Sequence, residues 1–404
     1  MDRIVMFSPL PPCKSGIGAY TAELLPTLTR MVGVTLVCQE QPDADEVDDL
    51  LRACPDLEVI PWPQYQPTPE QRACPHFFQI GNNKDHVFVY DAFRQRPQVL
   101  VQHDFNLHYL VEDATLARGD VAGYKAVMRE EYGDSGATLA DLRGIGVFSE
   151  SQKHTLPVNR HLVAIAKGVI VHNQWVYDRL PAAVRHRTVN VPHHYSPLAD
   201  QFRTLGPPEA RSVLGLPHDV PLILSLGFVT PPKRIHSTLS ALAMLKREGK
   251  KFRFVIAGER NPSFDIDDHI ARNDLVDEVI VTGYVSETDF FRYIRAADLL
   301  VNLRYPTVGE SSGTLARALA LGLPAIVYDF GPFSEFPDDV VHKVPLEKGE
   351  PVQLAAAIRR ILADVGYARS MSLTAISHMA KHCTVERSCE QYMRQAHLIR
   401  ETES

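Results

Sequence analysis

The stretch Asp298–Pro324 reads DLLVNLRYPTVGESSGTLARALALGLP and decides the fold class of this chain. Its apolar run Leu299–Val301 predicts a buried strand, and the polar, proline-broken segment after it predicts a loop. Gly313–Leu321 has the composition of a helix, which a glycine and a proline end before a second apolar strand begins at Ala325–Tyr328. The order strand, loop, helix, strand is the unit from which parallel α/β sheets are built.

The loop in this unit carries one carboxylate, Glu310, between two glycines and directly before the helix. Ser311 and Ser312 are good caps for the helix, and the free backbone N–H groups of a helix start attract a phosphate. Ligands bind at the carboxyl ends of the strands in open α/β sheets, which is where this loop lies. We therefore expect an active site here, with Glu310 among its residues.

The composition is that of a large globular protein. The chain has 404 residues, 45% of them hydrophobic and 23% charged, which is enough for about two domains. The net charge of -7 argues against nucleic acid as the main partner. It leaves open a local basic patch that faces a membrane or an anionic substrate.

The cysteines and acidic pairs favour a reduced chain without a structural metal. Six cysteines without C-x-x-C spacing suggest neither a zinc site nor a disulfide framework. The pairs Asp43/Asp45 and Asp265/Asp267 lie in polar stretches typical of solvated loops, so we expect no essential metal. The N-terminal apolar run is too short for a signal peptide, and no segment approaches the roughly 20 apolar residues of a membrane span. We expect a cytoplasmic protein, with a peripheral contact at the inner membrane face left open.

Alternating strands and helices predict two Rossmann-like domains, each with a parallel sheet covered on both faces. The expected division is 1–200 for an N-terminal domain, 201–220 for a linker, 221–380 for a second domain and 381–404 for a final helix. The expected strands are Ile4–Phe7, Val34–Val37, Phe77–Ile80, Val99–Val101, Gly168–Val171, Val189–Val191, Leu222–Leu226, Phe252–Ala257, Val279–Val281, Leu299–Val301 and Ala325–Tyr328.

Two strand ends of the first domain carry candidate ligand groups. The loop after the first strand holds Gly16 and Gly18, which let a backbone approach an anion at a helix start. Thr21 replaces the third glycine of a dinucleotide fingerprint, and a tight structural turn is the alternative. His103 and Asp104 directly follow another strand, where an imidazole can hydrogen-bond a sugar hydroxyl or a phosphate. A satisfied structural pair is the alternative there.

The second domain repeats this arrangement. Gly227 ends a strand, and Lys233 and Arg234 follow at the next helix start. Cations are unfavourable at a helix N-terminus, so their placement suggests a ligand's negative charge among them, unless both side chains are solvated. Two further strands end in loops at the same edge of the sheet. Gly258 follows one of these strands, and Tyr284 and Val285 follow the other.

Taken in chain order, these motifs resemble the family 4 retaining glycosyltransferases of the GT-B fold over nearly the whole sequence. The motifs are PPCKSGIGAY (Pro11–Tyr20), HD (His103 and Asp104), VIVHN (Val169–Asn173), GFVTPPK (Gly227–Lys233), VTGYV (Val281–Val285), AADLLVN (Ala296–Asn302) and the Glu310 loop. The resemblance implies an α/β protein with two Rossmann-like domains that face a central cleft. We expect its C-terminal helix to cross back to the first domain.

The resemblance also implies roles for single residues. The expected catalytic residues are His103, which would face the donor sugar near the reacting carbon, Glu310, which would contact that sugar, and Lys233, which would neutralise the diphosphate. Asp104 and His108 are expected on the acceptor side. The expected donor-binding residues are Gly16, Gly18, Gly227, Arg234, Gly258, Tyr284, Val285, Arg304, Ser311, Ser312, Gly313 and Thr314. No cofactor or metal is implied beyond the nucleotide-sugar co-substrate.

Two positions depart from the family's pattern. The second glutamate of its E-x7-E motif is replaced by Arg317 or Ala318, depending on an alignment shift of one residue, so the carboxylate that binds ribose is missing. Phe228 stands where the family has an arginine. Arg234 or Arg304 would then supply the second positive charge.

The leading hypothesis is a hexosyltransferase that uses a nucleotide-diphosphate sugar, with UDP or GDP as the expected nucleotide. The partner would be a hydroxyl acceptor in glycan or glycoconjugate synthesis, which is a saccharide or a lipid-linked or protein-linked glycan. The two departures favour the alternative, a catalytically silent homologue that binds a nucleotide sugar or a partner protein. A dinucleotide oxidoreductase is disfavoured because neither strand-to-helix turn carries the third glycine.

Overall fold

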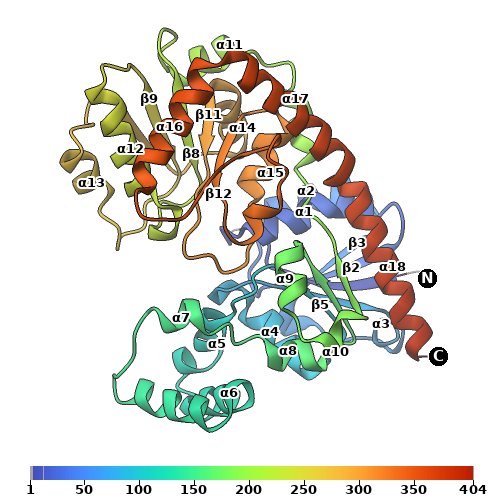
Figure 1. Cartoon of the computed structure of the whole chain (residues 1–404). Coiled ribbons are helices and arrows are strands. Elements are labelled where there is room, and N and C mark those ends of the chain that lie inside the picture. The colour runs from blue at the N-terminus through green and yellow to red at the C-terminus, as the bar shows by residue number, and fades with distance from the viewer. Residues whose placement is uncertain (1–2, 12, 404) are drawn as a thin grey trace. The chain divides into compact units, whose positions relative to one another are not determined.

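A computed structural model describes residues 3–11 and 13–403 of the chain (Figure 1). Pro12, which belongs to the predicted N-terminal glycine loop, lies outside the described residues. Residues 1, 2 and 404, which belong to the predicted ranges 1–200 and 381–404, also lie outside them. Contacts divide the chain into two compact units. Unit 1 comprises Met1–His193, Val308–Ser311 and Val385–Ser404, and unit 2 comprises His194–Thr307 and Ser312–Thr384.

Unit 1 is built on a seven-stranded parallel sheet with the order β3-β2-β1-β4-β5-β6-β7. Its strands are β1 (Arg3–Phe7), β2 (Gly33–Cys38), β3 (Leu57–Pro61), β4 (His76–Ile80), β5 (Val99–Gln102), β6 (Gly168–Val171) and β7 (Thr188–Asn190). Its helices are α1 (Gly16–Leu28), α2 (Ala44–Ala53), α3 (Pro69–Arg72), α4 (Val87–Gln95), α5 (His108–Ala114), α6 (Val121–Gly144), α7 (Gln152–Thr155), α8 (Arg160–Ile165), α9 (Gln174–Arg179), α10 (Ala182–Arg185) and α18 (Val385–Glu403).

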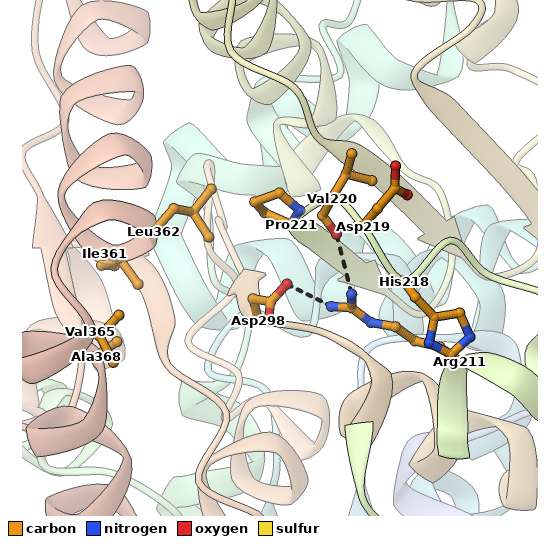
Figure 2. A pocket seen from close by; sticks show the side chains of 10 residues that line it. All are labelled: Arg211, His218, Asp219, Val220, Pro221, Asp298, Ile361, Leu362, Val365 and Ala368. Carbon is orange, nitrogen blue, oxygen red and sulfur yellow. Dashed lines mark hydrogen bonds and ion pairs between the residues drawn. The ribbon is translucent and has the colours of Figure 1, made fainter. Parts of the chain in front are cut away.

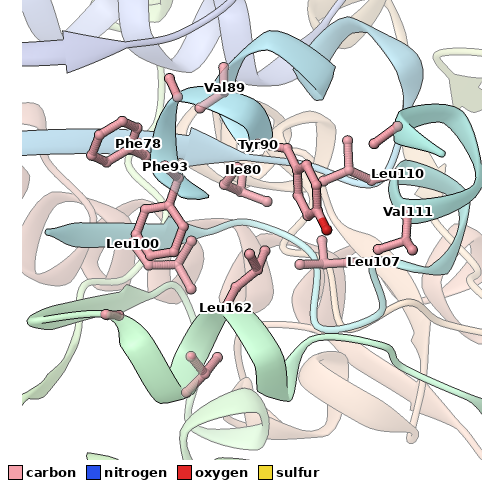
Figure 3. Packing of buried hydrophobic residues seen from close by; sticks show 14 of the residues in the cluster. Phe78, Ile80, Val89, Tyr90, Phe93, Leu100, Leu107, Leu110, Val111 and Leu162 are labelled. Carbon is pink, nitrogen blue, oxygen red and sulfur yellow. The ribbon is translucent and has the colours of Figure 1, made fainter. Parts of the chain in front are cut away.

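The inner strands of unit 1 are buried on both faces, as a parallel sheet requires. Alternate residues of one strand enter different cores because successive side chains point to opposite faces. Phe78 of β4 packs with α4, α5 and α8 in one cluster (Figure 3), whereas Phe77 packs with α1 in the other. A fully buried side chain of this kind contributes roughly 1.5–3 kcal/mol.

Helix α18 belongs to unit 1 although it ends the chain. Val385, Cys389, Ala396 and Ile399 are buried in the same cluster as Leu24 of α1. The expectation that the C-terminal helix returns to the first domain is therefore confirmed.

Unit 2 has a six-stranded parallel sheet with the order β10-β9-β8-β11-β12-β13. Its strands are β8 (Leu222–Leu226), β9 (Arg253–Ala257), β10 (Val279–Gly283), β11 (Leu299–Val301), β12 (Ala325–Tyr328) and β13 (His342–Val344). Its α-helices are α11 (Pro207–Leu214), α12 (Ile235–Arg247), α13 (Ile266–Arg272), α14 (Glu287–Ala296), α15 (Gly313–Ala320), α16 (Glu350–Ala363) and α17 (Val365–His382). Two cores again lie on opposite faces of the sheet.

The two Rossmann-like sheets confirm the predicted architecture, and all eleven predicted strands are present within a residue or two. Two strands were not predicted, β3 and β13. Both are edge strands with partly exposed residues, so their sequences lack a continuous apolar run. The stretch 201–220, expected as a linker, contains α11, whose Ala210 and Arg211 are buried.

Candidate functional site

Polar and aromatic groups of unit 1 meet at the carboxyl ends of its central strands. His103 follows β5, His172 follows β6 and His193 lies just beyond β7. All three imidazoles surround the Tyr20 ring of α1, with ring centroids 4.9, 5.1 and 5.0 Å from it. The strand-end location expected for His103 is therefore present, and the side chain is 7% exposed.

The carboxylates predicted in this region influence each other. Asp104 accepts a hydrogen bond from the backbone N–H of Asn82 at 2.7 Å. Burial, and next the negative charge of Glu310, raise the pKa of Asp104 to about 7. Glu310 accepts a hydrogen bond from the backbone N–H of Val308 at 2.9 Å. Two like-charged carboxyls near one another are typical of sites where a proton or a sugar hydroxyl is handled.

The loop Val308–Ser311 is part of unit 1 and is held by residues that follow β5 and β6. The side chain of Asn173 donates to the Gly309 carbonyl at 3.1 Å and to Ser311 Oγ at 3.2 Å. Ser311 Oγ donates to the carbonyl of His172 at 3.2 Å, and Asn106 N–H donates to the Val308 carbonyl at 2.9 Å. These bonds fix the backbone on both sides of Glu310.

Gly309 has to be glycine in this loop. Its φ is +81°, and a Cβ there would lie 2.4 Å from Phe105 Cβ and 3.0 Å from Trp175 Cζ3. A side chain would be strained and would also push these two rings away. The glycine before Glu310 thus permits the close packing that holds the loop.

The N-terminal glycines differ from each other. Ser15 caps α1 by accepting hydrogen bonds from Ile17 N–H and Gly18 N–H. A Cβ on Gly18 would lie 3.0 Å from the Pro9 carbonyl oxygen, so the turn itself needs this glycine. A Cβ on Gly16 would meet no described atom within 4 Å. Gly16 is therefore open on this side, whereas Gly18 serves the turn.

His108, predicted on the acceptor side, lies in α5 and is 2% exposed. Its Nε2 is 2.8 Å from the hydroxyl of Tyr124 in α6. Burial lowers the pKa of His108, so the imidazole is neutral at physiological pH. Its role in the structure is to join two helices.

In unit 2, Gly227 lies at the end of β8, close to Gly258, Lys233 and Thr314, and we call these four residues the Gly227 cradle. The φ of Gly227 is +88°, and a Cβ there would lie 2.7 Å from Lys233 Nζ and 3.7 Å from Thr314 Oγ1. A Cβ on Gly258 would lie 2.2 Å from the Gly227 carbonyl oxygen, so both glycines are required for this close approach. The structure thus brings Gly227, Gly258, Lys233 and Thr314 together, and their role in donor binding stays a prediction.

Lys233 is 8% exposed, which rules out the alternative that it is a solvated surface residue. Its Nζ donates to the carbonyl of Leu226. Burial, and next the positive charge of Arg304, hold the pKa of Lys233 well below its ordinary value. An anion beside Nζ would stabilise the charged ammonium, so this lysine is suited to bind one.

The start of α15 lies in the same cradle through Thr314. Ser312 caps the helix by accepting from the Leu315 N–H at 3.2 Å, and its hydroxyl donates to Asn302 Oδ1 at 3.3 Å. Asn302 is 4% exposed, and its Nδ2 has no hydrogen-bond partner among the described residues. A helix start, a buried lysine and a spare amide donor together form an anion-binding arrangement.

Arg234 has a partner within the chain. Its guanidinium is 2.7 Å from the Glu350 carboxylate and 3.4 Å from the Tyr328 hydroxyl. For Arg234, the negative charge predicted beside the cations is supplied by Glu350, the first residue of α16. Its role in donor binding stays a prediction, as does that of Arg304, whose charge acts on Lys233.

The remaining predicted donor residues lie at strand ends of unit 2. Tyr284 is 65% exposed after β10, and Val285 packs on the core beside it. At the position of the missing glutamate, Ala318 is fully buried, and the Arg317 guanidinium lies over the Phe290 ring at 5.9 Å. The eight residues of α15, all described, include no carboxylate.

Sequence reasoning assigned no role to several residues that build these sites. They include Gln79, Asn106, Asn173, Trp175 and Asn302. Asn173 and Asn302 end the VIVHN and AADLLVN motifs at strand ends, and that position is the only sequence feature that could have indicated them. Gln79 lies inside β4, where nothing separates it from a structural residue.

A separate pocket of unit 2 lies beside Pro221 and Asp298, which precede β8 and β11 (Figure 2). It is therefore at the amino ends of these strands, the opposite edge from the Gly227 cradle. Its arginine, Arg211, is 2.7 Å from the Asp298 carboxylate and donates to the Val220 carbonyl at 3.2 Å. Because the Arg211 guanidinium is already paired, its role here is structural: it joins α11 to the residues that precede β8 and β11.

Within residues 3–11 and 13–403, no cluster of three or more His, Cys, Asp or Glu side chains could hold a metal ion. Across the same described ranges, no helix is long and apolar enough to cross a membrane.

Comparisons with known proteins give a partial sequence match and a fold. Residues 207–378 match the family described as Glycosyl transferases group 1. The chain is 26% identical over 216 residues to an alpha-D-kanosaminyltransferase of Streptomyces kanamyceticus, which covers 51% of this chain and 53% of that protein. It is 30% identical over 121 residues to an alpha-monoglucosyldiacylglycerol synthase of Streptococcus pneumoniae, with coverage of 30% and 27%. The chain thus spans about half or less of the length of the curated relatives it matches.

Solved structures extend the likeness to the whole chain. A sucrose-phosphate synthase from Thermosynechococcus elongatus superposes with a TM-score of 0.68 at 17% identity and covers 100% of both chains. Alr3699/HepE of Anabaena, in complex with UDP and glucose, superposes with a TM-score of 0.64 at 13% identity and covers 98% of this chain and 99% of that one. At these identities the likeness shows the fold alone. The fold is GT-B, as predicted, and the sequence match to glycosyl transferases group 1 covers residues 207–378.

Proposed function

We propose that this protein is a retaining glycosyltransferase that moves a hexosyl group from a nucleotide-diphosphate sugar to a hydroxyl acceptor without a metal. The observation that carries the proposal is the cradle of unit 2, where Gly227, Lys233 and Thr314 meet at the start of α15. Its groups suit a diphosphate better than a neutral ligand, because a buried lysine gains most from an anionic partner.

The cradle would act on the leaving group. When the glycosidic bond of the donor breaks, the diphosphate gains negative charge, and preorganised donors at that place lower the barrier. The ammonium of Lys233, the backbone N–H groups of Gly313 and Thr314, and the amide of Asn302 are such donors. They would do the work that a bound metal does in other transferases.

Unit 1 would recognise sugar hydroxyls. His103 offers an imidazole, and Asp104 and Glu310 offer carboxyl groups, at the carboxyl ends of its strands. Carboxylates accept hydrogen bonds from hydroxyls, and a carboxyl with a pKa near 7 also donates one at neutral pH. The acceptor hydroxyl would attack on the face that the diphosphate leaves, with a phosphate oxygen of the leaving group as its base.

The matched relatives guide the choice of substrates. The names of the two curated relatives specify kanosaminyl transfer and the synthesis of alpha-monoglucosyldiacylglycerol. We therefore propose a hexose or an amino-hexose on UDP or GDP as donor and a polyhydroxylated saccharide or glycoconjugate as acceptor. A GT-B homologue that binds a nucleotide sugar without transferring it remains the alternative, because α15 lacks the ribose-binding carboxylate.

A donor panel tests the proposal. The protein is incubated with UDP- and GDP-linked hexoses, with and without EDTA, and release of the nucleoside diphosphate is measured. Turnover that persists in EDTA, with NMR of the product showing the donor's anomeric configuration, would support every part of the proposal. Stabilisation by a nucleotide sugar without release would support the silent homologue. Neither binding nor release of any donor would overturn the transferase.

A further inference from the structure

Helix α18 is attached to unit 1 through polar as well as apolar side chains. Ser388, Tyr392 and Gln395 are 1%, 0% and 2% exposed. An unpaired polar group in such a position costs free energy, and apolar residues would anchor the helix equally well. These side chains are therefore expected to make specific hydrogen bonds.

Tyr392 makes its bonds to the residues around His103. Its hydroxyl accepts from Gln79 Nε2 at 3.1 Å and donates to the Tyr20 hydroxyl at 3.4 Å, while Gln79 Oε1 lies farther away, at 3.5 Å. The other end of the Gln79 amide, Oε1, is 2.7 Å from His103 Nε2. Gln79 and Tyr20 are themselves fully buried, so water does not compete for these groups.

The direction of this chain of bonds decides which nitrogen of His103 carries the proton. An amide has one accepting and one donating end, and Gln79 uses the donating end on Tyr392. Its accepting end, Oε1, must then accept a hydrogen bond from His103 Nε2–H. Because the Tyr392 hydroxyl donates its single proton to Tyr20, it accepts from Gln79, and burial keeps it protonated by raising its pKa far above neutral.

We propose that the C-terminal helix selects the tautomer of His103 in which Nε2 is protonated, through Tyr392 and Gln79 as positioning residues. Nδ1 is then the unprotonated nitrogen and can accept a hydrogen bond from a hydroxyl. Only the link to catalysis rests on the proposed function, in which that hydroxyl belongs to a sugar. The tautomer itself is a property of the free protein.

A Tyr392→Phe substitution tests this proposal with a change of a single heavy atom. Tyr392→Phe removes the hydroxyl and keeps the ring that stacks on Phe77 at 5.3 Å between centroids. The Gln79 amide then loses the partner that orients it and can turn its donating end toward His103. Tyr367→Phe is a matched control, because the Tyr367 hydroxyl is 2.8 Å from His342 Nδ1 in unit 2.

The test is imidazole ¹⁵N NMR of the full-length, histidine-labelled protein without ligand, with the His103 signals assigned by their loss in His103→Gln. We expect a protonated Nε2 and an unprotonated Nδ1 in the parent protein, and a shift toward protonated Nδ1 in Tyr392→Phe. Tyr367→Phe should leave the His103 signals unchanged. The double variant Tyr392→Phe with Gln79→Glu should restore protonated Nε2, because a carboxylate only accepts.

Kinetics then show whether the tautomer matters to transfer. In Tyr392→Phe, the loss of one ordinary hydrogen bond that orients His103 should lower kcat by about fivefold to tenfold with little change in KM. Unchanged ¹⁵N signals in folded Tyr392→Phe would overturn the proposal, as would protonated Nδ1 in the parent protein. Because these readouts need no donor, they stand apart from a failure of the transferase assignment.

Discussion

Replacing Asp104 by asparagine should stabilise unit 1 at alkaline pH and change little at acid pH. Burial and the charge of Glu310 raise the pKa of Asp104 from 3.8 to about 7. Between these values the folded protein holds a proton that the unfolded chain has lost. The free energy of unfolding therefore falls as pH rises through this window, and the penalty is complete above pH of about 7.

The magnitude follows from the size of the shift. One pKa unit corresponds to about 1.4 kcal/mol, so a shift of roughly three units sets an upper limit of about 4 kcal/mol. Asp104 keeps some exposure, and solvent screening lowers the expected gain below this limit, to about 2–3 kcal/mol at pH 8. Asparagine cannot ionise, and its Oδ1 can still accept the 2.7 Å hydrogen bond from Asn82.

The two tryptophans of the chain provide the assay. Trp62 and Trp175 both belong to unit 1, so urea unfolding followed by tryptophan fluorescence reports on this unit. The parent protein and Asp104→Asn are compared at pH 4.5 and pH 8, with Asp134→Asn as the control, because the Asp134 side chain is fully exposed. If Asp104→Asn changes stability equally at both pH values, Asp104 does not titrate as reasoned here.

Three further changes have defined outcomes. Glu131→Gln should destabilise unit 1 by about 2–4 kcal/mol at pH 7, because the buried carboxylate binds His161 Nδ1 at 2.6 Å and His161 N–H at 2.7 Å. The pKa of Glu131 is lowered, so this contribution exists above the ordinary value near 4.5 and disappears as pH falls through the folded pKa; equal losses in urea melts at pH 7 and pH 3 would contradict it. Gly309→Ala should reduce kcat at least tenfold and expose the loop to proteolysis, since its Cβ would lie 2.4 Å from Phe105 Cβ; normal kcat would refute the packing argument. Glu310→Gln should abolish transfer with an unchanged urea midpoint at pH 4.5, and normal turnover would remove Glu310 from the site.

The sheets could be predicted because buried parallel strands are continuous apolar runs, and Leu222–Leu226 or Val99–Val101 has no other plausible structure. The ligand-binding edge followed from the same pattern, since loops such as that of Glu310 must emerge where strands end. Edge strands escaped prediction because they are short and half exposed, as in β3 and β13.

Contacts between distant residues could not be predicted from local pattern. Gln79 and Tyr392 are 313 positions apart, and the hydrogen bond between them depends on where α18 packs. Arg234 and Glu350 are 116 positions apart, so the charge of Arg234 could be read from its residue type but its partner could not. Neither spacing nor composition carries that information.

Calorimetric binding of nucleoside diphosphates tests the central claim, the diphosphate cradle, most directly. UDP and GDP are titrated into the parent protein, Lys233→Met and Lys246→Met, with the free nucleosides in parallel; Lys246 is a matched control because it pairs with Glu278 at 3.1 Å in the same unit. We predict that Lys233→Met lowers the affinity for the diphosphate by about 10–100-fold and leaves that for the nucleoside nearly unchanged. Equal losses for diphosphate and nucleoside, or none for either, would contradict the assignment of the cradle.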